Sequence, residues 1–466
     1  MGMKLFTVGP VACYPEVLEA MGMQMMSHRS REYIDLHFET VEMLQGFIET
    51  RNPVFLFSAK GTGFMEASVR NCVREKMIVC VNGSFGERYA EVARANGRDV
   101  VAVVTELGEP VQPEMIEAAI EAEPDAEAVA ITYNETSVGL INDLPALTEV
   151  CRRHGKLVFV DAVSSMGGTE LKADEWGIDI CFSSSQKCFG VPPGLGIGSV
   201  SQRALDASAE MPEKGWYFDL KVWEKDHRDH KGTPMTSCIP QVAGLNAALK
   251  MIEDRGGREW YFDLYRKRNK MIRSGVEEAG LSTYPMKGYE SPTVSCVTAP
   301  ERMKGPDVYK AMRGRGYELA QGYGALKETT FRIGIWGGCP RGTSWRCLGP
   351  SGKWPSFFPS LAARLNTHTR TGLPFPVAQR LPYVQYLAEV VGVVLDDHRD
   401  LAEVGVRCGP GDEGQQVYVR VLDQLHGLVH VAEELFHGLV PLLVRRLVPR
   451  LGPCLLYTSP SPRDRS

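Results

Sequence analysis

The sequence predicts an α/β fold in which a three-layer domain, built on a mostly parallel seven-stranded sheet, precedes a smaller α+β domain. Short β-rich runs alternate with amphipathic helical stretches between residues 54 and 201, as in sheets whose parallel strands are joined by helices. These runs are apolar at successive positions rather than at alternate ones. Continuous apolar character indicates strands that are buried between two helical layers.

Each element of this fold has its own segment of sequence. The expected strands are residues 54–57, 77–81, 100–104, 128–132, 157–161, 178–183 and 195–201. Amphipathic stretches such as 63–73 and 143–155 are expected to be the connecting helices, and a longer helix is expected near 242–257. The smaller unit then reads as a strand near 291–300, a helix near 306–316 and strands near 317–322 and 331–336.

These elements suggest four parts of the chain. They are an N-terminal segment (1–20), a large cofactor-binding domain (21–245), a small substrate-side domain (246–338) that is expected to be truncated, and an anomalous tail (339–466).

Composition favours an ordinary globular protein. The chain has 466 residues, of which 44% are hydrophobic and 23% charged, and a net charge of -5, so nothing suggests binding to nucleic acid. No apolar run has the length of a membrane span, and residues 1–10 have no secretory pattern. The 12 cysteines are scattered without CxxC pairs. We therefore expect reduced thiols, no metal site and a cytoplasmic location.

The tail differs from the rest of the chain in composition. Residues 341–466 contain thirteen Arg, one Lys and neither Ile nor Met. They begin with a Pro/Gly/Ser-rich stretch that is typical of linkers and include a helix-like apolar run at 425–448. This run could bind a partner or a membrane surface, but the final "CLLYTSPSPRDRS" resembles translated sequencing-adaptor read-through. Our hypothesis is that the tail is a chimeric or out-of-frame join, which resequencing would test.

Polar residues follow five of the expected strands, at the sheet edge where α/β proteins bind ligands. Lys187 stands among small and apolar residues in "SSQKCFG". Its amine is either partly desolvated, and then a nucleophile for an aldehyde, or it extends to the surface. Asp161 ends the run "LVFVD". Its carboxylate is either a helix cap or the partner of a buried cation such as a pyridinium nitrogen.

Four other features fit the same chemistry, each with a simpler alternative. "GTG" at 61–63 could offer backbone N–H groups to a phosphate or form an ordinary turn. Phe85 could stack on a flat ring or lie in the core. Thr136 could donate to a ring hydroxyl or cap a helix, and Arg332 could bind a carboxylate or join a surface ion pair. Together they describe pyridoxal phosphate and an amino-acid substrate.

These motifs resemble those of the class V, fold-type I aminotransferases of the alanine/serine–glyoxylate aminotransferase kind. The matching stretches run in family order from residue 5 to about 338: "SHRSREY" (27–33), "GTGFMEA" (61–67), "VNGSFGER" (81–88), "NETSVG" (134–139), "VDAVSSMGG" (160–168), "WGIDICFSSSQKCFGVPPG" (176–194), "GTPMTSCIP" (232–240) and "FRIG" (331–334).

The resemblance implies a role for each candidate residue. Lys187 would form the Schiff base and then move the proton, while Asp161 would bind the pyridine nitrogen. Phe85 would stack on the ring and Thr136 would bind its hydroxyl. The remaining implied roles are phosphate contacts from Gly61, Thr62, Gln186 and, across a homodimer interface, Thr236, with Arg332 holding the substrate α-carboxylate. The implied reaction is a ping-pong transfer from a small amino acid (alanine, serine or aspartate) to a 2-oxo acid such as glyoxylate or pyruvate.

Two departures and three alternatives accompany this resemblance. Lys60 stands where the family has a small Ser, and the chain leaves the family pattern after "RIG", so the small domain is expected to be incomplete. A 2-aminoethylphosphonate–pyruvate transaminase has similar motifs. A cysteine desulfurase would carry a His beside the lysine, where this chain has Gln186, and a non-catalytic fragment would be favoured only by the C-terminus. Arg29, in "SHRSREY", could read a second substrate carboxylate or form a surface ion pair.

Overall fold

The computed structural model describes residues 3–301, 303–337, 401–407 and 416–422. The chain divides into two compact units, Met1–Thr367 and His368–Ser466. In the second unit, the described residues are β15 (Leu401–Arg407) and β16 (Gln416–Leu422), an antiparallel pair with Leu401 opposite Leu422. The apolar run at 425–448 lies outside the described residues.

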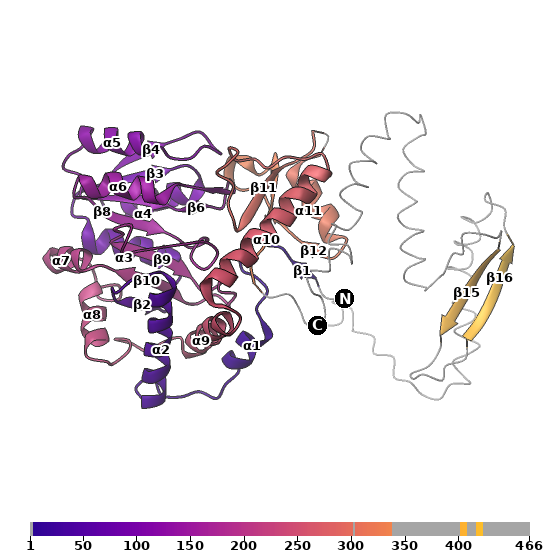
Figure 1. Ribbon diagram of the computed structural model, residues 1–466, viewed down its shortest axis with the longest axis horizontal. Helices are drawn as coiled ribbons and strands as arrows, with labels where there is room; N and C mark the ends of the chain where they lie inside the picture. The colour runs from indigo at the N-terminus through magenta and orange to yellow at the C-terminus, as the bar shows by residue number, and fades with distance from the viewer. Residues whose placement is uncertain (1–2, 302, 338–400, 408–415, 423–466) are drawn as a thin grey trace, which may run out of the picture. The chain divides into compact units, whose positions relative to one another are not determined.

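The described part of the first unit alternates helices and strands (Figure 1). Its helices are α1 (Pro15–Met21), α2 (Arg31–Phe47), α3 (Gly61–Cys72), α4 (Ser84–Ala95), α5 (Pro113–Ala122), α6 (Leu144–Arg153), α7 (Gln202–Glu210), α8 (Leu220–Arg228), α9 (Ile239–Asp254), α10 (Gly257–Glu278) and α11 (Gly305–Arg313), with a short 3-10 helix at Gly324–Leu326. Its strands are β1 (Lys4–Leu5), β2 (Val54–Phe57), β3 (Lys76–Val81), β4 (Asp99–Val104), β5 (Ala128–Thr132), β6 (Asn134–Glu135), β7 (Leu140–Ile141), β8 (Leu157–Asp161), β9 (Ile180–Ser184), β10 (Gly196–Val200), β11 (Val294–Thr298), β12 (Tyr317–Glu318), β13 (Ala320–Gln321) and β14 (Thr330–Gly334).

The central sheet confirms the predicted fold class. Its seven strands run in the order β2-β10-β9-β8-β5-β3-β4. Every predicted strand of the large domain is present, with its ends shifted by at most two residues. The pairs from β9 to β4 are parallel, whereas β10 is antiparallel to both neighbours. The carboxyl ends of β5, β8 and β9 therefore meet at one edge of the sheet, which is where the candidate residues follow them.

Two hydrophobic layers explain why the strands are apolar at successive positions. Side chains of alternate strand residues belong to different core clusters: Val158 and Val160 of β8 to one, and Phe159 to the other. Helices α2, α5, α6, α9 and α10 pack against the first face, and α3, α4, α7 and α8 against the second. Because both faces are covered, neither alternate set of strand residues meets water.

The small substrate-side part is an antiparallel sheet of order β11-β14-β13 with α11 and the long α10. The N-terminal segment joins it, because β1 pairs in parallel with β12 and the Gly334 N–H donates to the Phe6 carbonyl over 2.8 Å. This crossing requires glycine: a Cβ on Gly334 would lie 2.0 Å from the Thr7 carbonyl oxygen. Residues 6–12 are thus held against β14, beside the sheet edge that carries Lys187.

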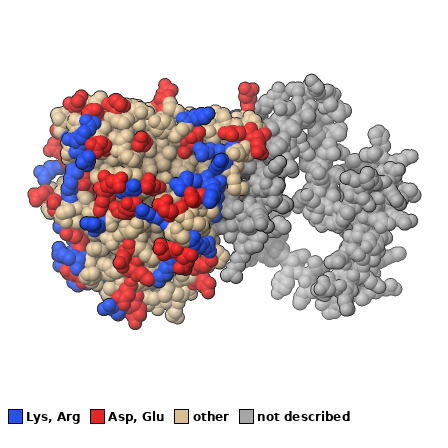
Figure 2. Space-filling model, viewed as in Figure 1, with Lys and Arg blue, Asp and Glu red and all other residues tan. Residues whose placement is uncertain are grey.

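Two surface properties accompany this architecture. Acidic and basic side chains are interspersed over the visible face of the described residues (Figure 2). Within the same residues, no helix combines the length and the apolar character needed to cross a membrane.

Candidate active site

Lys187 lies in the loop that follows β9, and its amine is largely removed from water. Its Nζ donates to the Val8 carbonyl over 2.6 Å and lies 4.8 Å from the centre of the Trp336 ring. Burial, followed by the positive charge of Arg332, lowers the pKa of Lys187 from its ordinary value to about 8. The structure therefore supports the desolvated amine rather than the surface lysine.

Two tyrosines of α10 hold the backbone next to this lysine in place. The hydroxyls of Tyr261 and Tyr265, one helical turn apart, both donate to the Cys188 carbonyl, over 2.5 and 2.9 Å. Both side chains are fully buried. The Cys188 thiol donates to Ser164 over 3.6 Å, and burial raises its pKa well above the ordinary thiol value. Cys188 is therefore a core thiol, and its peptide group is an anchor for Lys187.

Asp161, the last residue of β8, is buried with its carboxylate beside the lysine. Its Oδ1 accepts a hydrogen bond from the Val163 N–H over 2.8 Å. Burial raises the pKa of Asp161 to about 7, and the charge of Lys187 counteracts part of this shift. A buried carboxylate with so little compensation is suited to a cationic partner, which would favour its ionised form. No helix of the described residues begins at Asp161, so its alternative role as a helix cap is wrong; the carboxylate instead accepts from the turn that follows β8.

Phe85 lies in the first turn of α4, where Glu135 binds its backbone N–H. The fully buried Glu135 carboxylate accepts from the backbone N–H groups of Phe85 and Gly86, over 2.9 and 3.1 Å, and from the Ser137 N–H and hydroxyl. The carboxylate thus satisfies the free N–H groups of the α4 N-terminus. The Phe85 ring is half-buried and stacks on Tyr323 with the ring centres 5.9 Å apart.

Arg332, in the middle of β14, is buried beside Lys187 rather than exposed at the surface. Its Nε donates to the Gln321 carbonyl over 2.9 Å and its Nη1 to the Thr136 carbonyl over 3.0 Å. No carboxylate of the described residues pairs with it, so the surface ion pair is wrong. Burial lowers its pKa from the ordinary value. Thr136 is buried in the β6–β7 turn and begins no helix, so its alternative role as a helix cap is also wrong.

The N-terminus of α3 has the properties of a phosphate cradle. Lys60 occupies the N-cap position without a side-chain cap, and the first turn contains no acidic residue. Gly61 donates its N–H to the Ser184 hydroxyl over 2.8 Å, and a Cβ there would lie 2.3 Å from Val163. Thr62 is exposed in the same turn. The partial positive charge of this helix N-terminus, with no acidic side chain in its first turn, favours an anion.

Gln186 contributes a second indication that the expected cofactor fits here. Its Oε1 is buried and has no hydrogen-bond partner among the described residues. A buried amide atom without a partner is costly in a finished core. A half-turn of the side-chain amide exchanges this oxygen for the NH2 group, which can donate to a phosphate oxygen and complete the site. With the cradle at Gly61, the amine of Lys187 and the carboxylate of Asp161, the donor set fits pyridoxal phosphate.

Arg29 and Thr236 lie apart from this group within the single chain. The Arg29 guanidinium donates to the carbonyls of Lys231, Thr233 and Pro234, over 3.0, 2.7 and 3.3 Å. Its predicted alternative, a surface ion pair, is therefore corrected: the partners are backbone oxygens of the loop that leads to Thr236. Thr236 itself is exposed. Among the described residues, no hydrogen bond, ion pair or ring contact joins either residue to Lys187, and a role for them in binding stays a prediction.

Sequence reasoning missed several residues that complete the site. They are Val8, Glu135, Tyr261, Tyr265, Tyr323 and Trp336. Glu135 belongs to the stretch "NETSVG", but the N–H groups that it accepts from lie 50 and 49 positions earlier in the chain. Val8 and Trp336 contact Lys187, Tyr323 contacts Phe85, and Tyr261 and Tyr265 bond to Cys188. No local pattern encodes contacts across such sequence separations.

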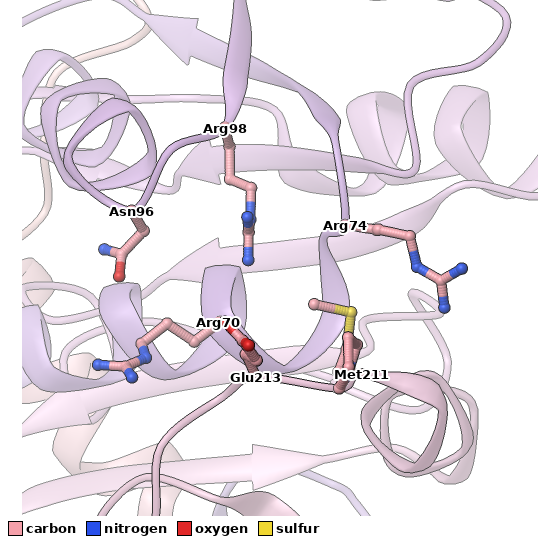
Figure 3. A pocket seen from close by; sticks show the side chains of 7 residues that line it. Arg70, Arg74, Asn96, Arg98, Met211 and Glu213 are labelled. Carbon is pink, nitrogen blue, oxygen red and sulfur yellow. The ribbon is translucent and has the colours of Figure 1, made fainter.

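A second hollow lies away from this group. A pocket of about 380 Å³ is lined by residues from the ends of α3 and α4 and by Met211, Pro212 and Glu213 (Figure 3). It borders the starts of β3 and β4, the opposite edge of the sheet from Asp161 and Lys187.

Comparison with known proteins places this site in a family. Residues 12–331 match the family model "Aminotransferase class-V". The chain is 33% identical over 350 residues to the serine–glyoxylate aminotransferase of Methylorubrum extorquens, covering 71% of this chain and 85% of that protein. It is 30% identical over 341 residues to the L-aspartate–glyoxylate aminotransferase of Paracoccus denitrificans, again covering 71% of this chain and 85% of that protein.

Solved structures agree with this similarity. The crystal structure of an alanine–glyoxylate aminotransferase from Nostoc sp. superposes with a TM-score of 0.69 at 29% identity, covering 72% of this chain and 90% of that one. The similarity confirms the fold class predicted from the sequence.

Proposed function

Because the chain belongs to the class-V aminotransferases, we propose that it transfers the amino group of a small amino acid, namely alanine, serine or aspartate, to a 2-oxo acid such as glyoxylate or pyruvate. The chain is a pyridoxal-phosphate-dependent aminotransferase. The names of its relatives, which act on serine, aspartate or alanine with glyoxylate, support the substrate classes of the proposal.

The observation that carries the proposal is the convergence of three groups. After burial, the positive charge of Arg332, a guanidinium without a carboxylate partner among the described residues, lowers the pKa of Lys187, and the buried carboxylate of Asp161 raises it. An amino-acid substrate offers the complementary groups, an amine and an α-carboxylate. Arg332 has a planar fork of donors for the carboxylate, and two backbone carbonyls hold that fork in place.

Each residue has a defined part in the reaction. When bound, pyridoxal phosphate supplies an aldehyde that captures the amino group and a ring that withdraws electrons. Lys187 would hold the aldehyde carbon, and its Nζ, neutral in part near pH 8, moves a proton to and from the substrate α-carbon. Asp161 would hold the pyridine nitrogen and keep it charged. Phe85, held by Glu135, would orient the ring, and the α3 N-terminus with Gln186 would hold the phosphate.

We also propose that the enzyme works as a homodimer in the cytoplasm. Thr236 is exposed in the single chain although its loop is held by Arg29, which suits a loop that contributes to a partner's site. The eight cysteines of the described residues are free, six of them buried, which suits a reducing compartment. Light scattering of the cofactor-loaded protein would measure the oligomeric state, and a monomeric mass would contradict the first proposal.

A spectrum of the purified chain tests the function. We expect a visible absorbance band from the lysine-bound cofactor, which should bleach on adding one of alanine, serine and aspartate and return on adding glyoxylate or pyruvate. The variant Lys187→Ala is the control, because it should bind the cofactor without that band. A wild-type band that none of the three amino acids bleaches would contradict the proposed donors.

A further inference from the structure

The pocket at the opposite edge of the central sheet is rich in arginine. Arg70 comes from the last turn of α3, and Arg74 lies between this helix and β3. Arg98 directly precedes β4, and Asn96 is the C-cap of α4. Glu213 is the one carboxylate among the lining residues. Three arginines and one carboxylate thus line a volume of about 380 Å³, which lies in the range of small-molecule sites.

The partners of the three guanidinium groups differ. Arg70 pairs with Glu66 of its own helix, N to O 3.1 Å. Arg74 donates to the Glu210 carbonyl over 3.1 Å and extends away from Arg98 in Figure 3. Among the described residues, Arg98 forms neither an ion pair nor a hydrogen bond, and its Nε is a buried nitrogen without an acceptor. The Arg98 side chain is half-buried, and this Nε lacks the acceptor that a desolvated N–H needs.

Helix electrostatics do not account for Arg98. Basic side chains in the last turn of a helix compensate the partial negative charge of its free carbonyls. Arg70 has this position in α3, and Arg94 has it in α4. Arg98 comes after α4 has ended at Ala95 and points into the pocket (Figure 3). Its charge is therefore available to a ligand.

We propose that this pocket binds a small phosphate monoester. The Arg98 guanidinium, in a pocket that Arg70 and Arg74 also line, offers the fork of donors that matches phosphate oxygens. Because Glu66 pairs with Arg70, Arg74 and Arg98 leave a surplus of one positive charge over Glu213, which suits an anion. Met211 and Pro212 form an apolar wall, which suits a short organic group attached to the phosphate. The site is separate from Lys187 and does not depend on the proposed substrates.

Calorimetric titration of the full chain, loaded with pyridoxal phosphate and freed of unbound cofactor, tests this site in a phosphate-free buffer. The probes are glycerol 3-phosphate, inorganic phosphate and succinate. We expect one glycerol 3-phosphate per chain, bound more tightly than either other probe. Equal or tighter binding of succinate would indicate a dicarboxylate site and overturn the proposal. Absence of binding by all three probes would also overturn it.

Three variants locate the binding. Arg98→Gln is expected to weaken glycerol 3-phosphate at least about tenfold, the loss of one charge-assisted contact. Glu213→Gln is expected to strengthen it, because the substitution removes a like charge from the pocket. Arg94→Gln, which removes an exposed arginine paired with Glu87 outside the pocket, is expected to change nothing. If Arg98→Gln and Glu213→Gln both leave the affinity as in the wild type, binding occurs elsewhere and the proposal fails.

The affinities of the variants can be compared only if each variant retains its fold. The visible band of the bound cofactor, which depends on the opposite edge of the sheet, reports this in the same samples. If Arg98→Gln loses that band, Arg70→Gln serves as the second variant with the same expected weakening, and wild-type affinity in Arg70→Gln would then overturn the proposal.

Discussion

The catalytic site has two halves that are held in different ways. The strand-end half consists of Asp161, the last residue of β8, and Lys187, in the loop after β9. Both strands lie in the middle of a seven-stranded sheet. The closing half consists of Val8 in the N-terminal segment, Arg332 of β14 and Trp336 shortly after it. The Val8 carbonyl accepts from Lys187, and Arg332 donates to the β6–β7 turn at Thr136. The first half can place reacting atoms accurately, whereas the second can follow the shape of a substrate. We therefore expect chemistry to depend on the first and substrate choice on the second.

The largest effect is expected in the strand-end half, from Lys187→Ala. Loss of the amine removes both the covalent link and the base, so activity should fall at least about a thousandfold for every substrate pair. Steady-state kinetics with each donor measures this. The matched control is Lys172→Ala, a lysine paired with Glu170 and Glu175 at the surface, and it should keep wild-type rates. A residual rate that differed strongly between donors would contradict the division into two halves.

A smaller and selective effect is expected in the closing half, from Arg332→Gln. Removing a buried guanidinium that pairs with a carboxylate should lower kcat/KM for amino acids about a hundredfold. The slow reaction of a simple amine without a carboxylate should stay unchanged, and the ratio of the two rates is the measurement. Arg313→Gln, at the surface pair with Glu318, is the control. An equal loss for both classes of donor would show that Arg332 acts on the chemistry itself.

The strands and the reacting residues of the first half were predictable because each rests on a local signal. Apolar runs buried on both faces determine the strands, and polar residues at their ends determine Asp161 and Lys187. The closing half was only partly predictable. Arg332 carried a signal through its resemblance to a family motif, but Val8 reaches Lys187 across 179 positions of sequence. Such a contact depends on how the small sheet packs against the large domain, which no local pattern reports.

Arg29 shows what a motif leaves open. Its place in a family-like motif allowed either a second substrate carboxylate or a surface ion pair, and three backbone carbonyls of one loop accept from its guanidinium. Residue type and motif indicate which groups a side chain can bind, but not which of the available partners it meets. Backbone carbonyls of a nearby loop can also accept from a guanidinium.

The pH dependence of cofactor uptake tests the coupling between the halves. Only the neutral amine of Lys187 reacts with the aldehyde, and burial lowers its pKa from 10.5 to about 8. The rate at which the apoenzyme takes up pyridoxal phosphate should therefore rise with pH, with a midpoint near 8. Because the positive charge of Arg332 also disfavours the protonated amine, Arg332→Gln should move the midpoint upwards. A midpoint near 10.5 in the wild type would mean that the amine is solvated.

The smallest effect is expected from the anchor beneath the strand-end half. Tyr261→Phe and Tyr265→Phe each remove one hydroxyl donor to the Cys188 carbonyl, which should cost about 1 kcal/mol of unfolding free energy apiece. Because this carbonyl follows Lys187, the double variant should also lower kcat severalfold at nearly constant KM and shift the midpoint of cofactor uptake. Denaturant unfolding and the uptake profile measure the two effects separately.

Tyr89→Phe distinguishes an anchor from a merely structural hydroxyl. The Tyr89 hydroxyl is equally buried and bonds to the Ser68 hydroxyl over 2.6 Å, away from the lysine loop. Its loss should cost a similar unfolding free energy and leave both kcat and the uptake midpoint unchanged. If the double variant at Tyr261 and Tyr265 behaved in the same way, the sheet alone would position Lys187, and the strand-end half would need no support from α10. If only the double variant shifts the midpoint, α10 links the small substrate-side part to the reacting amine.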